Sequence, residues 1–131
     1  MMQVLSGSLV ALVTPMEQNG DVDFNALENL IEWHIQNGSD GIVSVGTTGE
    51  SATLSIDEHL DVIKHTVKFV NGRIPVIAGS GSNSTAQAIE TTKESLKIGA
   101  DYSLLVTPYY NKPSQKGLIE HYTKIANSSD M

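Results

Sequence analysis

Four short apolar runs recur along the chain, and glycine, threonine or proline follows each of them at once. They cover residues 9–13, 41–45, 75–78 and 102–106. Each run is four or five residues long and lacks the alternation of apolar and polar positions that is typical of a half-exposed strand. We therefore predict four strands buried on both faces, as in a parallel sheet.

Amphipathic helices are predicted between and after these runs. Phe24, Leu27 and Ile31 recur at helical spacing in the first helix, which should end at the Asn-Gly pair 37–38. The second and third helices each open with a serine placed three residues before Glu58 or Gln87, which predicts a capping box at both. These two helices should end at the Asn-Gly pair 71–72 and at Gly99, and a fourth helix should begin near Ser114.

The resulting order is a strand followed by a helix, four times over. Such alternation predicts an α/β fold, with parallel strands joined by right-handed helical crossovers. Two architectures fit this order: a small doubly wound sheet, and the first four βα units of a (β/α)8 TIM barrel. A complete barrel takes about 250 residues, so residues 1–131 would form half of a single barrel domain, with no separate second domain. The outer strands of an isolated four-stranded sheet would have open edges, which favours a chain that is incomplete or pairs with something.

Composition narrows the classes of function. The 131 residues include 8 Lys and Arg against 15 Asp and Glu, so the formal net charge is −7, which disfavours binding to nucleic acid. The chain has no cysteine, which excludes disulfides, thiolate metal sites and a cysteine nucleophile. No apolar run is long enough for a membrane helix, and no positive charge precedes the first run as in a signal peptide. We therefore expect a cytoplasmic protein without a membrane partner.

Candidate chemistry lies in the loops after the strands, because parallel α/β folds bind ligands beyond the carboxyl ends of their strands. Two glycines bracket Thr47 and Thr48 after the second run, so that backbone amides and hydroxyls could hold a small carboxylate without arginine. Tyr109 and Tyr110 follow the fourth run. Adjacent tyrosines commonly pack, one inward and one across an interface, but a phenol can also pass protons through a neighbouring threonine hydroxyl.

Histidines and lysines limit the chemistry further. The four histidines fall on predicted helices without metal-ligand spacing, so we expect no metal site and place the histidines at the surface or at an interface. All seven lysines lie on predicted helices or in the fourth loop. None lies in a strand, where burial could lower the pKa of its amine enough for Schiff-base chemistry.

Four long segments resemble the dihydrodipicolinate synthase group of the pyruvate-dependent Schiff-base aldolases, a family that includes N-acetylneuraminate lyase. They are GSLVALVTPM (7–16), VSVGTTGESATL (43–54), GRIPVIAG (72–79) and VTPYYNKPSQ (106–115). The resemblance implies a TIM barrel, a homotetramer built from tight dimers, and condensation of pyruvate with aspartate semialdehyde on the way to lysine and diaminopimelate, without a cofactor. The Thr-Thr pair favours the synthase, whereas neuraminate lyases typically carry Ser-Thr at this position.

The resemblance also implies residue roles. Thr48 would bind the pyruvate carboxylate, Thr47 would take part in a proton relay, and Tyr110 would complete that relay in the neighbouring subunit. In the family, the imine lysine and the proton-donating tyrosine come from later strands, so we expect the 131-residue chain to be inactive alone. Two alternatives remain: another pyruvate-dependent aldolase acting on a neuraminate or keto-deoxy sugar, and a half-barrel that serves only in assembly.

Some family members are inhibited by lysine at the dimer interface. The resemblance places this site at Ser51, Ala52, His59, Asn83, Gln87 and Tyr109, together with Ile56. Ile56 stands where inhibited members carry histidine, and Gln87 where they carry glutamate. The full-length enzyme is therefore expected to be weakly inhibited by lysine or insensitive to it, because the ammonium group of the ligand loses a carboxylate partner.

Overall fold

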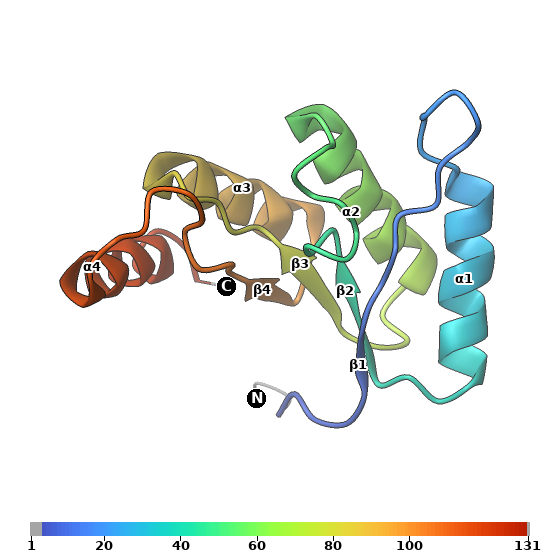
Figure 1. Ribbon diagram of the computed structural model, residues 1–131. Coiled ribbons are helices and arrows are strands. Elements are labelled where there is room, and N and C mark those ends of the chain that lie inside the picture. The colour runs from blue at the N-terminus through green and yellow to red at the C-terminus, as the bar shows by residue number, and fades with distance from the viewer. Residues whose placement is uncertain (1–3, 131) are drawn as a thin grey trace.

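The computed structural model describes residues 4–130 and contains one four-stranded parallel sheet (Figure 1). Its strands are β1 (Leu9–Ala11), β2 (Gly41–Ser44), β3 (Val76–Gly79) and β4 (Tyr102–Leu104), and they lie in the order β1-β2-β3-β4. The helices are α1 (Phe24–Gln36), α2 (Ile56–Val70), α3 (Thr85–Ile98) and α4 (Gln115–Ala126). The predicted α/β class and the order of its four βα units are confirmed.

The helices follow one another along one side of the sheet, with α1 beside α2, α2 beside α3 and α3 beside α4 (Figure 1). Right-handed crossovers that always advance in the same direction place every helix on the same face. A doubly wound sheet would instead carry helices on both faces. The sequential strand order therefore favours the barrel over the doubly wound alternative.

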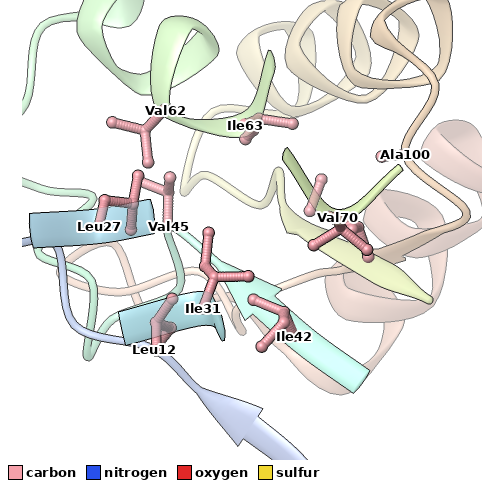
Figure 2. Close-up of a cluster of buried hydrophobic side chains, with 11 residues drawn as sticks. Leu12, Leu27, Ile31, Ile42, Val45, Val62, Ile63, Val70 and Ala100 are labelled. Carbon is pink, nitrogen blue, oxygen red and sulfur yellow. The ribbon is translucent and has the colours of Figure 1, made fainter. Parts of the chain in front are cut away.

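The core lies between the sheet and the helices (Figure 2). Leu27 and Ile31 of α1, together with Ile63 of α2, are at most 1% exposed and pack in one cluster with Ile42 of β2. Such residues recur at helical spacing on α1 and α2, so each of these two helices turns an apolar stripe toward the sheet. None of the helices in the part of the chain that the structure describes has the length and hydropathy needed to span a membrane.

Burial on both faces is confirmed for the central strands and wrong for the outer ones. All residues of β2 and β3 are buried, whereas β1 and β4 are only partly buried and each ends in an exposed residue. The reason is geometric: in the sheet formed by residues 4–130, an outer strand has a neighbour on one side alone.

The predicted capping serines are present at α2 and α3, but only α2 forms the complete capping box. The capping box of α2 is present, since Ser55 Oγ accepts from the Glu58 amide and Glu58 Oε2 accepts from the Ser55 amide. At α3, Ser84 Oγ accepts from the Gln87 amide, but the predicted reciprocal bond is not formed. Ser82 Oγ takes that role by accepting from the Ser84 amide and donating to Gln87 Oε1.

Candidate functional site

The loops that follow β2, β3 and β4 meet at the carboxyl end of the sheet, where their backbones are in close contact. A Cβ built on Gly79 would overlap the carbonyl oxygen of Val45, and one built on Gly81 would overlap the amide of Val106. Glycine is required at both positions because no side chain fits between the adjoining loops. The contact between Gly79 and Val45 therefore determines the position at which the β2 loop leaves the sheet.

The β2 loop begins and ends with left-handed residues. Val45 has φ 54° and Glu50 has φ 60°, conformations that are uncommon for residues other than glycine and costly for a β-branched valine. Between them, the Glu50 amide donates to Thr47 O at 3.1 Å, and Thr14 Oγ1 donates to Gly49 O at 2.7 Å. Glu50 thus braces the loop through its backbone.

Thr47 and Thr48 lie at the exposed tip of this loop. Thr47 lines two cavities, of about 310 and about 180 Å³, while Thr48 faces solvent and lines neither. Both hydroxyls follow the carboxyl end of β2, on the side of the sheet where ligands bind in parallel α/β folds. The structure therefore leaves both hydroxyls accessible to a small ligand, rather than packed in the core.

Both tyrosines of the β4 loop are exposed in the single chain. Tyr110 is 94% exposed with φ 68°, and Tyr109 is 51% exposed. Among residues 4–130, no hydrogen bond joins Thr47 to Tyr110, so a single chain does not assemble the relay that the resemblance implies. Asn83 supports this loop by donating from Nδ2 to Tyr109 O at 3.2 Å.

The cavity of about 310 Å³ gathers most residues of the expected lysine site. Its lining includes Ser51, Ala52, Ile56, His59, Gln87 and Tyr109. Asn83 lies beside the cavity through its bond to the Tyr109 carbonyl, and does not line it. Glu50 supplies the one carboxylate among the described lining residues.

His59 is buried at the wall of this cavity, with 7% of its surface exposed. Its Nε2–H donates to Gly79 O at 2.7 Å, which leaves Nδ1 without a proton in the neutral ring. Burial lowers the pKa of His59, and the hydrogen bond to Gly79 opposes this shift only in part. Of the two placements expected for the histidines, the surface is wrong for His59 and for the 5%-exposed His121, because both rings fill space between a helix and its neighbours, and the interface stays a prediction.

No strand carries a lysine, and within the described residues no three His, Asp or Glu side chains converge as a metal site requires. A larger cavity of about 620 Å³ lies at the other end of the sheet, next to Asp40, Arg73 and Asp101. These residues precede strands, so this cavity lies far from the Thr47 loop. Arg73 is already engaged there by Glu32 at 2.7 Å.

Two features of the site were not predicted from the sequence. The left-handed Val45 gives no local signal, because valine is the least expected residue in that conformation. The bond from His59 to Gly79 joins residues that are 20 positions apart. The sequence signal that could have indicated it is His59 itself, a histidine next to the apolar stripe of the second predicted helix.

Comparisons with known proteins agree with this geometry. Residues 4–131 match the model of the dihydrodipicolinate synthetase family. The 4-hydroxy-tetrahydrodipicolinate synthase of Neisseria gonorrhoeae is 57% identical over 126 residues, which cover 96% of this chain and 43% of that protein. The chain therefore spans less than half the length of the curated relatives that it matches.

Solved structures give the same result. A chloride-inhibited dihydrodipicolinate synthase from Acinetobacter baumannii, complexed with pyruvate, superimposes with a TM-score of 0.94 at 57% identity, over 95% of this chain and 43% of that one. The enzyme from Cyanidioschyzon merolae with lysine bound superimposes with a TM-score of 0.90 at 48% identity, over 93% and 42%. The four βα units thus correspond to the N-terminal half of a TIM barrel, and the chain belongs to the dihydrodipicolinate synthetase family.

Proposed function

We propose that this chain forms the pyruvate-binding half of a 4-hydroxy-tetrahydrodipicolinate synthase, a lyase that condenses pyruvate with aspartate semialdehyde in lysine biosynthesis. The observation that supports this function best is the exposed Thr47-Thr48 pair at the carboxyl end of β2, held by the contact between Gly79 and Val45. Identity of 57% to an enzyme complexed with pyruvate supports the same ligand.

In this proposal, Thr48 donates hydrogen bonds to the pyruvate carboxylate, and Thr47 passes protons together with Tyr110 of a neighbouring subunit. The 94% exposure of Tyr110 supports a role outside its own chain. A homotetramer in the cytoplasm, as the family resemblance implies, would supply that neighbour. The amine that forms the imine is a lysine contributed by the remainder of the barrel, since no strand here carries one.

Fusion to the remainder of a relative tests this function. Residues 1–131 would be joined to the C-terminal part of the Neisseria gonorrhoeae enzyme, and kcat and KM for pyruvate would be measured. Thr48→Val should raise KM about 10-fold or more, because hydrogen bonds to a charged group contribute about 1.5–3 kcal/mol. Thr123→Val, on the exposed surface of α4, serves as the matched control and should leave KM unchanged.

Borohydride trapping provides the second readout. With pyruvate, the fusion should gain the mass of a reduced imine, and the 131-residue chain alone should not. A stable adduct on the isolated chain, or an unchanged KM in Thr48→Val, would contradict the proposed roles.

We also propose that lysine inhibits the whole enzyme weakly or not at all. Ile56 and Gln87 contribute no charge to the 310 Å³ cavity, and Gln87 Oε1 already accepts from Ser82 at 3.0 Å. The ammonium group of a bound lysine would therefore lack a carboxylate at this wall of the cavity.

A further inference from the structure

Thr14 connects the segment after β1 to the loop that carries Thr47 and Thr48. The residue is buried, with 5% of its surface exposed, and its hydroxyl donates to the carbonyl oxygen of Gly49 at 2.7 Å. The two bonded residues are 35 positions apart in the chain. A buried hydroxyl needs a hydrogen-bond partner, and this one finds its partner in the candidate site rather than in its own segment.

The bond from Thr14 holds a peptide group whose other end is also held. The carbonyl of Gly49 and the amide of Glu50 belong to one planar peptide unit. Thr14 Oγ1 donates to that carbonyl, and the Glu50 amide donates to Thr47 O at 3.1 Å. The plane of this peptide therefore cannot rotate without breaking a hydrogen bond, and Glu50 is kept at its left-handed φ of 60°.

The same peptide closes the turn on which the candidate hydroxyls lie. The bond from the Glu50 amide to Thr47 O spans four residues, as in a β-turn. Thr48 and Gly49 occupy the two central positions of this turn. Thr48 thus immediately precedes the residue whose carbonyl Thr14 holds, so rotation of the held peptide would tilt the turn and displace the Thr48 hydroxyl.

Gly49 is itself buried and closely packed. A Cβ built there would lie 3.0 Å from Val45 Cα, 3.1 Å from Leu12 O and 3.2 Å from Thr14 Oγ1. The glycine therefore lies between the left-handed Val45 and the segment after β1. Among residues 4–130, Thr14 is the donor that satisfies the Gly49 carbonyl, and a buried carbonyl that loses its donor is destabilised.

Thr14 is held in place on both sides along the chain. Two residues earlier, the Leu12 amide extends the pairing of β1 with β2 by donating to Val43 O at 3.1 Å. One residue later, Pro15 O accepts from the Asp23 amide at 2.9 Å, and Asp23 is the residue that caps α1. Sheet pairing and the start of α1 thus determine where the Thr14 hydroxyl meets the β2 loop.

We propose that Thr14 is a positioning residue for pyruvate binding, which acts through the Gly49 carbonyl to orient the Thr48 hydroxyl. Its own hydroxyl touches no ligand, because it is buried and engaged by Gly49. This inference rests on the proposed function, since it explains how Thr48 is placed to bind the pyruvate carboxylate.

Substitutions at position 14 of the fusion enzyme test this role. Thr14→Val removes the hydroxyl and keeps the shape of the side chain, and it should raise KM for pyruvate about 10-fold, because a small displacement of a binding group has a large effect. The value of kcat should change less than KM, since Thr48 binds the substrate. Thr14→Ser keeps the hydroxyl and should bring KM back to within about 3-fold of the unsubstituted value.

Thr85→Val is the matched control. The Thr85 hydroxyl also bonds to a distant residue, Nδ1 of His121 at 2.9 Å and 36 positions away, but it lies on α3 outside the β2 loop. This control should lose stability in a urea titration without a change in KM. Borohydride trapping at increasing pyruvate concentrations adds a readout that needs no turnover, and half-maximal trapping should require more pyruvate in Thr14→Val but not in Thr85→Val.

A double variant that combines Thr14→Val with Thr48→Val identifies the route of the effect. If Thr14 acts through the Thr48 hydroxyl, the double variant should have the KM of Thr48→Val alone, because a hydroxyl that is absent cannot be misplaced. Effects that multiply would show that Thr14 acts by another route and would overturn the inference. Failure of Thr14→Ser to restore KM would overturn it as well.

The two proposals fail in different ways. An unchanged KM in Thr48→Val would refute the role of Thr48 and, with it, that of Thr14. A raised KM in Thr48→Val together with an unchanged KM in Thr14→Val would leave the proposed function intact and overturn the positioning role alone. If Thr14→Val does not fold, Thr14→Cys replaces it, because a thiol is a weaker donor. Its KM should also rise, and an unchanged value would overturn the inference.

Discussion

At the scale of single residues, the site depends on how closely the loops approach each other. The contact at Gly79 leaves no room for a side chain, because the backbone of this residue lies directly against the carbonyl group of Val45. That contact supports a left-handed valine, whose conformation costs about 1–3 kcal/mol and persists only where its surroundings hold it. Thr47 and Thr48 therefore owe their position to two residues that carry no reactive group.

Substituting Gly79 tests this dependence. Gly79→Ala should lower the free energy of unfolding by about 1–3 kcal/mol or more, because the added methyl group overlaps backbone and the loops must separate. Gly46→Ala is the control, since its nearest neighbour would be at 3.5 Å. Urea titration of both variants provides the measurement, and equal losses would show that the contact is not tight.

Gln87 decides the charge of the neighbouring cavity. In the fusion enzyme, Gln87→Glu should lower the lysine concentration needed for half-maximal inhibition by about 10-fold, because a charged hydrogen bond is restored. Gln115→Glu makes the same change at the exposed start of α4 and should have no effect. Potent inhibition of the unsubstituted enzyme by lysine would refute the proposed insensitivity.

His59 links stability to pH. Since burial lowers its pKa in the folded chain, the unfolded chain binds the proton more readily. The free energy of unfolding should be largest above the ordinary histidine pKa of about 6.5 and fall as the pH decreases below it. His59→Gln, which keeps an N–H donor, should reduce this fall, whereas His34→Gln should not. Identical pH profiles in all three proteins would exclude His59 as the cause.

At the scale of elements, each helix begins at a residue whose side chain accepts a bond from the first turn. Asp23, Ser55, Ser84 and Ser114 all do so. The caps differ in which side chain accepts a hydrogen bond from the backbone amide of the capping residue. At α2 it is Glu58, whereas at α3 it is Ser82 from the β3 loop. The start of α3 is thus coupled to the loop that contacts the β4 loop.

The two caps should respond differently to substitution. Ser55→Ala and Ser84→Ala should each cost about 1 kcal/mol of stability. In the fusion enzyme, only Ser84→Ala should also alter inhibitor binding at the cavity, because Ser82 and Gln87 both line it. Thermal unfolding and lysine titration of the two variants measure these effects, and identical behaviour in both assays would argue against the coupling.

At the scale of the whole molecule, the sheet is half of a closed structure. Its outer strands β1 and β4 each have a neighbour on one side alone, which explains why only β2 and β3 are fully buried.

The sequence alone determined the local features of this protein. Helix ends at Asn37, Asn71 and Gly99, the alternation of strands with helices, and the loop with Thr47 and Thr48 follow from patterns within a few residues, and the structure agrees with them. Periodicity, capping and turn chemistry act over one or two turns of chain, so they can be identified without a fold. The family motifs added the expected roles.

Only the tertiary structure decided which predicted features lie in contact. His59 is buried against Gly79, and Ser82 instead of Gln87 completes the α3 cap. The cavity residues come from three loops and the helices α2 and α3, and β1 and β4 have a neighbouring strand on one side only. Each of these depends on residues that are distant in the chain and close in space. Their geometry is set by packing of the sheet against the helices, and no local pattern contains that information.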